Sequence, residues 1–172
     1  MLMKEKYELQ GRYDDVKMDF AQLFSEQSVI RLIQCFYWEQ NWPRIIYKRT
    51  MNRSFLYVVV SGEFTVSTPE TGVDRIGPGQ IIYMPAGQLH TAMNIHCNLV
   101  KAYGIHFHWQ LPGYRTDARL FNDKILINPH PGYWNEQLAR LTAALNRVGD
   151  ATAAAWSSTI LRAFLVDLIF NH

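Results

Sequence analysis

The pattern of hydrophobic and polar residues divides the chain into regions with different periods. From residue 29 to about residue 127, short β-branched and aromatic runs alternate with turn residues at roughly even intervals. The runs include SVIRLIQCFYW, FLYVVV, FTVST, IIYM and LVKAYGIHFHW, and they are separated by SG, PETG, GPGQ and PAG. Glycine supplies positive φ in such turns and proline presets φ. The spacing predicts an antiparallel sandwich or barrel, not βαβ units.

The period becomes helical after NPHPGYW. Apolar residues recur at steps of three and four at Leu138, Leu141, Leu145 and Val148. This pattern predicts a helix that ends near Gly149, and Asp150 or Thr152 can cap a second helix. The second helix repeats apolar residues every four positions at Trp156, Ile160, Phe164 and Leu168, with Leu161, Leu165 and Ile169 beside them. We therefore expect a hairpin of two helices after the barrel.

The second helix is apolar over too wide an arc for a surface helix, so it must be covered on more than one side. The first helix and the barrel cover part of it. Either these contacts close the core of a monomer, or a second subunit covers the rest, and we expect the second subunit. The residues expected in this dimer contact are Trp156, Ile160, Leu161, Phe164, Leu165 and Leu168.

These periods predict three parts. Residues 1–28 are mixed and polar, and their pattern does not decide between an arm, a strand and a short helix. Residues 29–128 form the expected barrel, and residues 129–172 form the expected two-helix segment.

The composition of the chain excludes several classes of function. The 172 residues are 48% hydrophobic and 19% charged, and the net charge of +2 is scattered. Such a chain has no basic patch for gripping a nucleic-acid backbone. Its two cysteines form no C-x-x-C pair, which fits a reducing compartment. We find neither a secretory signal nor an apolar run of about 18 residues, so we expect a soluble, cytoplasmic protein that does not enter a membrane.

The stretch GQIIYMPAGQLHTAMN carries fixed positions at Gly79, Pro85, Gly87, His90 and Asn94. Their spacing, G-x5-P-x-G-x2-H-x3-N, matches the second sequence motif of the cupin superfamily without a mismatch. The residue types fit the local structure that this motif requires, because the Pro-x-Gly turn reverses the chain between two strands. In cupins this histidine points into the barrel.

The first cupin motif supplies the metal partners of that histidine. With Gly62 as its closing glycine, its glutamate position falls on Phe55. Its two histidine positions fall on Arg49 and Met51, or on Lys48 and Thr50 for the other spacing. None of these side chains is an ordinary metal ligand. We therefore expect a metal-free barrel without a cofactor, in which His90 is either a hydrogen-bonding pocket residue or a satisfied core histidine.

His106 and His108 alternate with Phe107, so both lie on one face of a strand. Together with His90 they would form a different metal cluster. Such a pair is more often part of a polar strand face or of a barrel rim, and the spacing alone does not show that the three histidines converge.

The order SFLYVVVSGEFTV, IGPGQIIYMPAGQLHTA and AYGIHFHW, followed by two helices, resembles the N-terminal effector-binding and dimerisation domain of AraC-type bacterial transcription regulators. The resemblance covers about residues 42–172. It implies a degenerate cupin barrel that binds a small metabolite, often a sugar, and helices that form a homodimer. In that family a C-terminal domain with two helix-turn-helix units binds DNA, and this sequence does not contain it. In relatives such as the arabinose regulator, an N-terminal arm closes over the ligand, and residues 1–28 are candidates for that role.

The expected role is allosteric and not enzymatic. Strand parity from the cupin motif places Arg49, Phe55, Tyr57 and His90 inside the barrel, and Tyr83 and His106 are further candidates for ligand contact. A guanidinium can hold a carboxylate or a pair of hydroxyls, and a phenol can stack and donate. The alternatives are a surface arginine and tyrosines that pack in the core. For the whole chain, the alternatives are a small cupin enzyme, an isomerase or a dioxygenase, and a free-standing binding module.

Overall fold

The computed structural model describes residues 28–41, 44–69, 72–94, 99–110, 120–121, 125–146 and 151–171. The expected N-terminal arm, apart from Ser28, lies outside these residues. The described strands are β1 (Val29–Gln40), β2 (Arg44–Arg49), β3 (Ser54–Ser61), β4 (Phe64–Thr68), β5 (Gly72–Ile76), β6 (Gln80–Met84), β7 (His90–Asn94), β8 (Val100–Gln110) and β9 (Ile125–Ile127). Two helices follow them, α3 (Pro131–Leu145) and α4 (Ala151–Phe170).

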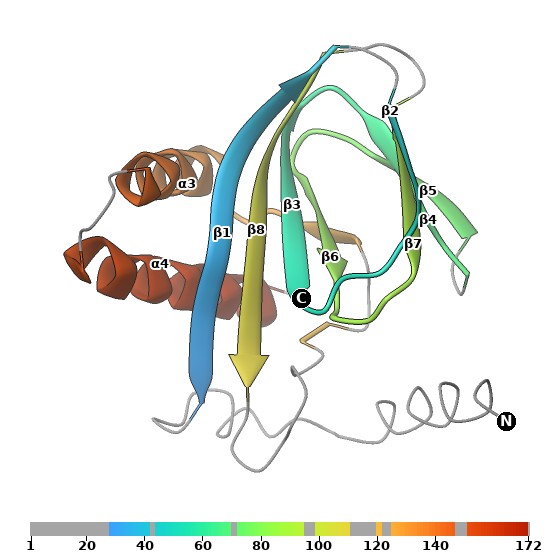
Figure 1. The fold of residues 1–172 in the computed structure, drawn as a ribbon. Coiled ribbons are helices and arrows are strands. Elements are labelled where there is room, and N and C mark those ends of the chain that lie inside the picture. The colour runs from blue at the N-terminus through green and yellow to red at the C-terminus, as the bar shows by residue number, and fades with distance from the viewer. Residues whose placement is uncertain are drawn as a thin grey trace, which may run out of the picture.

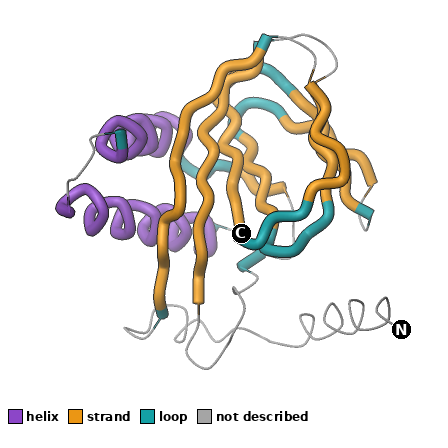
Figure 2. The backbone as a smooth tube through the Cα atoms, in the orientation of Figure 1, coloured by secondary structure: helices purple, strands orange, loops and turns teal. Residues whose placement is uncertain are grey.

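The described strands form two antiparallel sheets that face each other (Figures 1 and 2). One sheet has the order β1-β8-β3-β6-β9, and the other has the order β2-β7-β4-β5. Among the first eight strands, the first pairs with the eighth, the second with the seventh, the third with the sixth and the fourth with the fifth. The chain is thus one long hairpin, rolled up by the additional pairs β3–β8 and β4–β7. This is a jelly roll, the double-stranded β-helix barrel of cupin-like proteins, as the sequence predicted.

The central strand β3 of the larger sheet is buried on both faces, which explains why it is a nearly continuous apolar run and not an alternating one. In β3, Leu56 and Val58 face the helices, whereas Phe55 and Val59 face the barrel interior. Each of these side chains is at most 2% exposed. The sheet therefore separates two cores, one inside the barrel and one beneath the helices.

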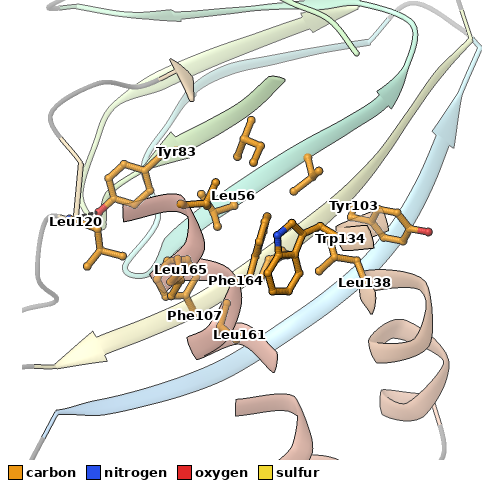
Figure 3. Packing of buried hydrophobic residues seen from close by; sticks show 14 of the residues in the cluster. Leu56, Tyr83, Tyr103, Phe107, Leu120, Trp134, Leu138, Leu161, Phe164 and Leu165 are labelled. Atoms are coloured by element: carbon orange, nitrogen blue, oxygen red, sulfur yellow. Dashed lines mark hydrogen bonds between the residues drawn. The ribbon is translucent and has the colours of Figure 1, made fainter. Parts of the chain in front are cut away.

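The two helices lie side by side against the outer face of the larger sheet (Figure 1). Helix α3 begins with Pro131, which suits a first helical turn because the missing N–H would have no partner there. It buries Trp134, Leu138 and Leu141. Figure 3 shows this layer, where helix side chains pack between the helices and the strands. Within the described residues, no helix combines the length and the apolar character needed to cross a membrane.

The outer core changes the interpretation of α4. The side chains of Leu161, Phe164, Leu165 and Leu168 are at most 1% exposed, because the sheet and α3 already cover them. Trp156 and Ile160 are partly buried against the same core. The four fully buried residues are thus part of the chain's own core and are not available to a second subunit. The wide apolar arc of α4 reflects a deep position between sheet and helix.

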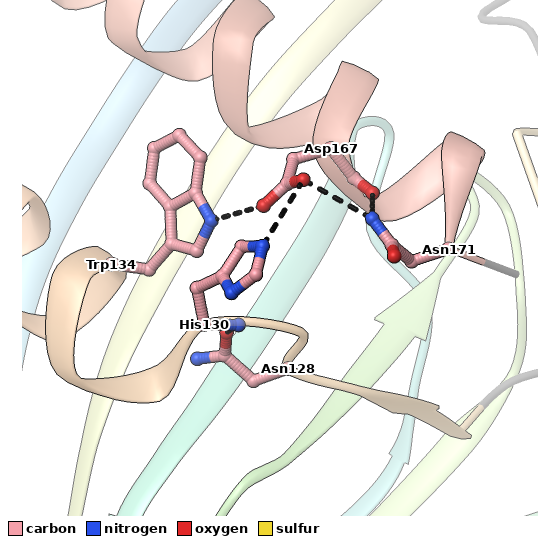
Figure 4. A network of polar contacts seen from close by, with 5 residues as sticks. All are labelled: Asn128, His130, Trp134, Asp167 and Asn171. Carbon is pink, nitrogen blue, oxygen red and sulfur yellow. Dashed lines mark hydrogen bonds and ion pairs between the residues drawn. The ribbon is translucent and has the colours of Figure 1, made fainter.

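A polar network joins the start of α3 to the end of α4 (Figure 4). The Trp134 indole N–H donates to Asp167 Oδ2 at 2.6 Å, and Asn171 Nδ2 donates to the Asp167 backbone carbonyl at 2.7 Å. His130 Nε2 lies 4.0 Å from Asp167 Oδ1. The carboxyl group of Asp167 in α4 satisfies the buried indole N–H of Trp134 in α3, which fixes the two helices relative to each other.

Candidate ligand-binding site

A cavity of about 250 Å³ lies inside the barrel. Residues of β1, β2, β3, β4, β7 and β8 and of the β2–β3 turn line it. The lining residues are Gln34, Phe36, Trp38, Gln40, Arg49, Arg53, Tyr57, Phe64, Ala92, Met93, Asn94 and His106. Strand β1 contributes four of them at alternate positions, as expected for one face of a strand. The cavity is of a size that suits a small molecule.

Aromatic rings form one wall of the cavity. The Trp38 ring meets Tyr57 at a centroid distance of 6.2 Å and Phe64 at 6.0 Å, both edge to face. Phe36 meets the His106 ring edge to face at 5.5 Å. These spacings are typical of packed aromatic clusters. The wall therefore presents rigid apolar surface against which a flat or aliphatic group can pack.

Two guanidinium groups supply the charge of the cavity. Arg49 ends β2 opposite His90, and Arg53 lies in the turn before β3. No Asp or Glu is among the lining residues, and neither arginine forms an ion pair with a carboxylate in the described part of the chain. The cavity consequently carries positive charge that these residues do not neutralise.

His106 is held by one of these arginines. The Arg53 Nε–H donates to His106 Nδ1 at 3.2 Å. The side chain is 4% exposed, and its burial, together with the charges of Arg53 and Arg49, lowers the pKa of His106 from 6.5 to about 4. The ring is therefore neutral at pH 7, with its proton on Nε2 because Nδ1 accepts a hydrogen bond. No described residue pairs with this buried Nε2.

His90, the histidine of the cupin-type motif, lies beside the cavity and not among its lining residues. Its Nδ1–H donates to the Gln88 carbonyl at 3.2 Å, and its ring packs on Phe55 at 5.1 Å. Burial lowers the pKa of His90, the Gln88 carbonyl opposes that effect, and Arg49 adds to it. The Phe55 ring also meets His106 at 5.7 Å, so it lies against both histidines. His90 thus supports the pocket from behind.

The residues at the cupin metal positions do not fit a metal ion. Of the positions derived from the two motifs, His90 alone carries an imidazole, while Phe55 and Met51 are buried apolar side chains of the inner core. The guanidinium of Arg49 adds a positive charge where cation ligands would converge. The described residues contain no group of three His, Cys, Asp or Glu side chains placed to hold a metal ion, including the alternative cluster of three histidines. His108 is half-buried on the same strand face as His106.

The structure thus brings Arg49, Tyr57 and His106 together around the cavity, with Phe55 and His90 behind them. Tyr83 is not in this group. In β6, Ile82 and Met84 face the barrel interior, so Tyr83 faces the helices, as Figure 3 shows. Its hydroxyl accepts a hydrogen bond from the Leu120 backbone N–H at 3.0 Å, and its side chain is 1% exposed. Tyr83 is a core residue, and its proposed ligand contact is wrong on this geometry.

Several lining residues lie outside the set of site residues expected from the sequence. Strand β1 contributes Gln34, Phe36, Trp38 and Gln40, whose alternation in QCFYWEQ was the available signal. Arg53 had no such signal, because strand parity says nothing about a side chain in a turn.

Searches of protein-family models and of curated proteins find no match to the sequence. A search of solved structures does find proteins of similar fold. The AraC-family regulator ToxT from Vibrio cholerae O395 is 10% identical, with a TM-score of 0.47 over 86% of this chain and 56% of ToxT. A cupin superfamily protein from Desulfitobacterium hafniense DCB-2 is 14% identical, with a TM-score of 0.39 over 54% of this chain and 91% of that chain.

An RmlC-like cupin with a double-stranded β-helix fold from Methanocaldococcus jannaschii is 15% identical, with a TM-score of 0.40 over 48% of this chain and 82% of its own. Likenesses of this degree assign no function. The assignment of a cupin-like jelly roll rests on the strand order of the chain itself.

Proposed function

We propose that this chain is the effector-binding and dimerisation domain of an AraC-type transcription regulator, and that its effector binds inside the barrel. The observation that carries the proposal is the cavity of about 250 Å³, which combines an aromatic wall with the cationic groups of Arg49 and Arg53. A concave, largely apolar site with a few convergent polar groups is typical of small-molecule binding. The resemblance of the sequence from about residue 42 to residue 172 to such domains supplies the regulatory part of the proposal.

The side chains around the cavity favour binding over catalysis. Arg49 and Arg53 remain charged at any pH a cell reaches, so they hold a ligand and do not exchange protons with it. His106 is neutral at pH 7 and its Nδ1 is engaged by Arg53. A general base needs a free acceptor close to the reacting proton, and this nitrogen is not free.

The dimer in this proposal uses the outward side of the C-terminal helices. The residues of α4 that face away from the core include Ala155, Thr159 and Ala163 at intervals of four, and Phe170, which is 72% exposed. Small residues at this spacing allow close helix contact. Analytical ultracentrifugation of the chain tests this part. A concentration-dependent dimer is expected, and a strictly monomeric species at high concentration contradicts it.

The regulatory part is tested by sequencing the native gene beyond the codon for His172. An open frame that encodes two helix-turn-helix units is expected. A stop codon at that point contradicts the regulator and leaves a free-standing binding module or a small cupin enzyme.

The effector part is tested in the native full-length protein by its operator binding. A ligand that occupies the cavity is expected to change operator affinity, because it binds the two states of the protein with different affinities. Arg49→Gln is expected to retain operator binding in the absence of ligand and to lose the response. Arg140→Gln, on the exposed side of α3, is the matched control. An unchanged response in Arg49→Gln places the effector elsewhere.

A further inference from the structure

Three of the polar side chains that line the cavity can only donate hydrogen bonds, whereas Gln34, Gln40, Asn94 and Tyr57 can also accept them. Arg49 and Arg53 donate only, since a guanidinium has no acceptor. His106 uses its acceptor Nδ1 for Arg53, so its remaining nitrogen, Nε2, is also a donor. The cavity thus has three donor side chains from three separate places in the chain: the end of β2, the β2–β3 turn and the middle of β8.

The Nε2–H of His106 has no partner among the described residues, although the side chain is 96% buried. A buried donor without an acceptor costs free energy, and proteins rarely leave one unless a water or a ligand completes it. Arg53 fixes the tautomer, because its Nε–H requires an acceptor at Nδ1. His106 lines the cavity, so the structure places this unpartnered donor beside the cavity and next to two positive charges.

We propose that the effector is a small carboxylate with a flat or aliphatic body, whose carboxylate accepts hydrogen bonds from Arg49, Arg53 and the Nε2–H of His106. The body packs against the aromatic wall of Phe36, Trp38, Tyr57 and Phe64. This inference rests on the proposed function for the location of the site, and it adds the chemical class of the ligand.

A carboxylate fits these groups better than a neutral sugar does. Sugar hydroxyls both donate and accept, so a sugar is usually bound by a mixture of carboxylates, amides and cations. Here the lining residues offer amides at Gln34, Gln40 and Asn94 but no carboxylate. Two guanidiniums in a cavity whose described lining residues include no acid attract an anionic group, which a neutral sugar does not provide.

The test uses isothermal titration calorimetry on the chain with benzoate, phenylacetate and hexanoate as probes. Each is paired with its neutral amide, which has nearly the same shape. At least one carboxylate is expected to bind more than about tenfold more tightly than its amide, the difference typical of a charge-assisted pair. This comparison needs no variant, so it remains decisive if a pocket variant fails to fold.

Two variants locate the binding. Arg49→Gln and Arg53→Gln are each expected to weaken carboxylate binding by about tenfold or more, and Arg140→Gln is expected to leave it unchanged. In an ¹⁵N spectrum of histidine side chains, free His106 is expected to carry its proton on Nε2. That signal is expected to shift when the carboxylate is added.

The outcomes separate this inference from the proposed function. Binding of arabinose in an Arg49-dependent manner, without binding of any carboxylate probe, overturns the carboxylate and leaves effector binding intact. Tighter binding of phenyl phosphate than of every carboxylate overturns it in favour of a phosphate. The inference is also overturned if no carboxylate binds at millimolar concentration, or if both Arg→Gln variants bind it as well as the native chain does. A gene that ends at codon 172 contradicts the regulator alone, and the carboxylate site then stands.

Discussion

Acidification is expected to destabilise the fold through His106. The pKa of this histidine is about 4 in the folded chain, lowered first by burial and then by the charges of Arg53 and Arg49, and its ordinary value is 6.5. Between these two values the unfolded chain binds a proton at this position and the folded chain does not. Stability therefore falls as the pH falls below 6.5, and the loss is complete below pH 4. Above pH 7 the group is neutral in both states and contributes no pH dependence.

The structure sets the size of this effect. A pKa lowered from 6.5 to about 4 corresponds to a loss of about 3 kcal/mol in the free energy of unfolding. About 60% of that loss is expected by pH 5. His106 is 4% exposed, so solvent screening reduces the figure less than it would at the surface. For a domain of this size, such a loss is a substantial fraction of the total stability.

The assay is urea unfolding, followed by tryptophan fluorescence at a series of pH values from 7.5 to about 4, the interval over which the two states of this group differ. His106→Gln keeps a neutral hydrogen-bonding side chain at the position, so the difference between the two pH curves isolates this histidine. Carboxylates and His90, whose pKa burial also lowers, are present in both proteins. Tyr57→Phe changes a neighbouring ring without a titration in this range and is the matched control.

Parallel curves for the native chain and His106→Gln would refute the reasoning, because they would show that His106 takes up its proton equally in the folded and unfolded states. Proton NMR of the His106 ring provides a direct check if the variant does not fold. Its titration midpoint is expected near 4, and a midpoint near 6.5 contradicts the buried, arginine-flanked environment.

Three packing predictions concern other parts of the chain. Gly104→Ala would place a methyl carbon 2.8 Å from two ring carbons of Phe36. We expect the free energy of unfolding, measured with urea, to fall by about 1–3 kcal/mol and ligand binding in the cavity to weaken. Adding Phe36→Leu should relieve both effects, and a double variant that is no more stable than Gly104→Ala alone contradicts this. Gly62→Ala should lower the melting temperature more than Gly72→Ala does. Both glycines have positive φ, but only a Cβ at position 62 would clash with the backbone at the start of β8. Equal losses in melting temperature contradict this prediction. Trp134→Phe removes the indole donor to the α4 carboxylate at 2.6 Å and should cost about 1–3 kcal/mol, measured by urea unfolding, where an unchanged midpoint contradicts it.

The local pattern predicted the elements well because each has a local cause. The apolar runs separated by Gly and Pro turns predict the strands of the barrel. The recurrence of apolar residues at every third and fourth position predicts α3, which ends at Leu145, a few residues before the predicted end. The pairing of β1 with β8 joins residues about seventy positions apart, and such register depends on the whole rolled sheet. The cupin-type motif, not the period, pointed to the jelly roll.

The covering of α4 could not be read from its sequence. An apolar arc shows that a helix is covered, but it does not identify the cover. In the structure, the chain's own sheet and α3 bury Leu161, Phe164, Leu165 and Leu168, which are among the residues expected in the dimer contact. The sheet needs that layer because its outer face is apolar. The choice between a second subunit and the chain's own sheet as the cover of α4 depends on the apolar face of the sheet as well as on that of the helix.

The site was predictable where strand parity applied and not elsewhere. Arg49 and Tyr57 follow from the register that the cupin-type motif sets, and both line the cavity. The same parity excludes Tyr83, since its neighbours in β6 face inward. Arg53 lies in a turn, where no period predicts the direction of a side chain. Its role depends on a contact with His106, which is fifty-three positions away in the chain.

Strand β1 connects the cavity to the helices. One face of the strand supplies Phe36 and Trp38 to the cavity wall. On the other face, Cys35 Sγ lies 3.4 Å from the hydroxyl of Thr142 in α3, and α4 also packs on the strand. Cys35 is buried, and this burial raises the pKa of its thiol to about 11, so it serves as a packing group and not as a nucleophile. A tightly packed strand cannot shift on one side alone, because close-packed interiors transmit displacement. A ligand that moves Phe36 or Trp38 must therefore also change the contacts of α3 and α4, and the helices can respond only by as much free energy as the ligand gains from that movement.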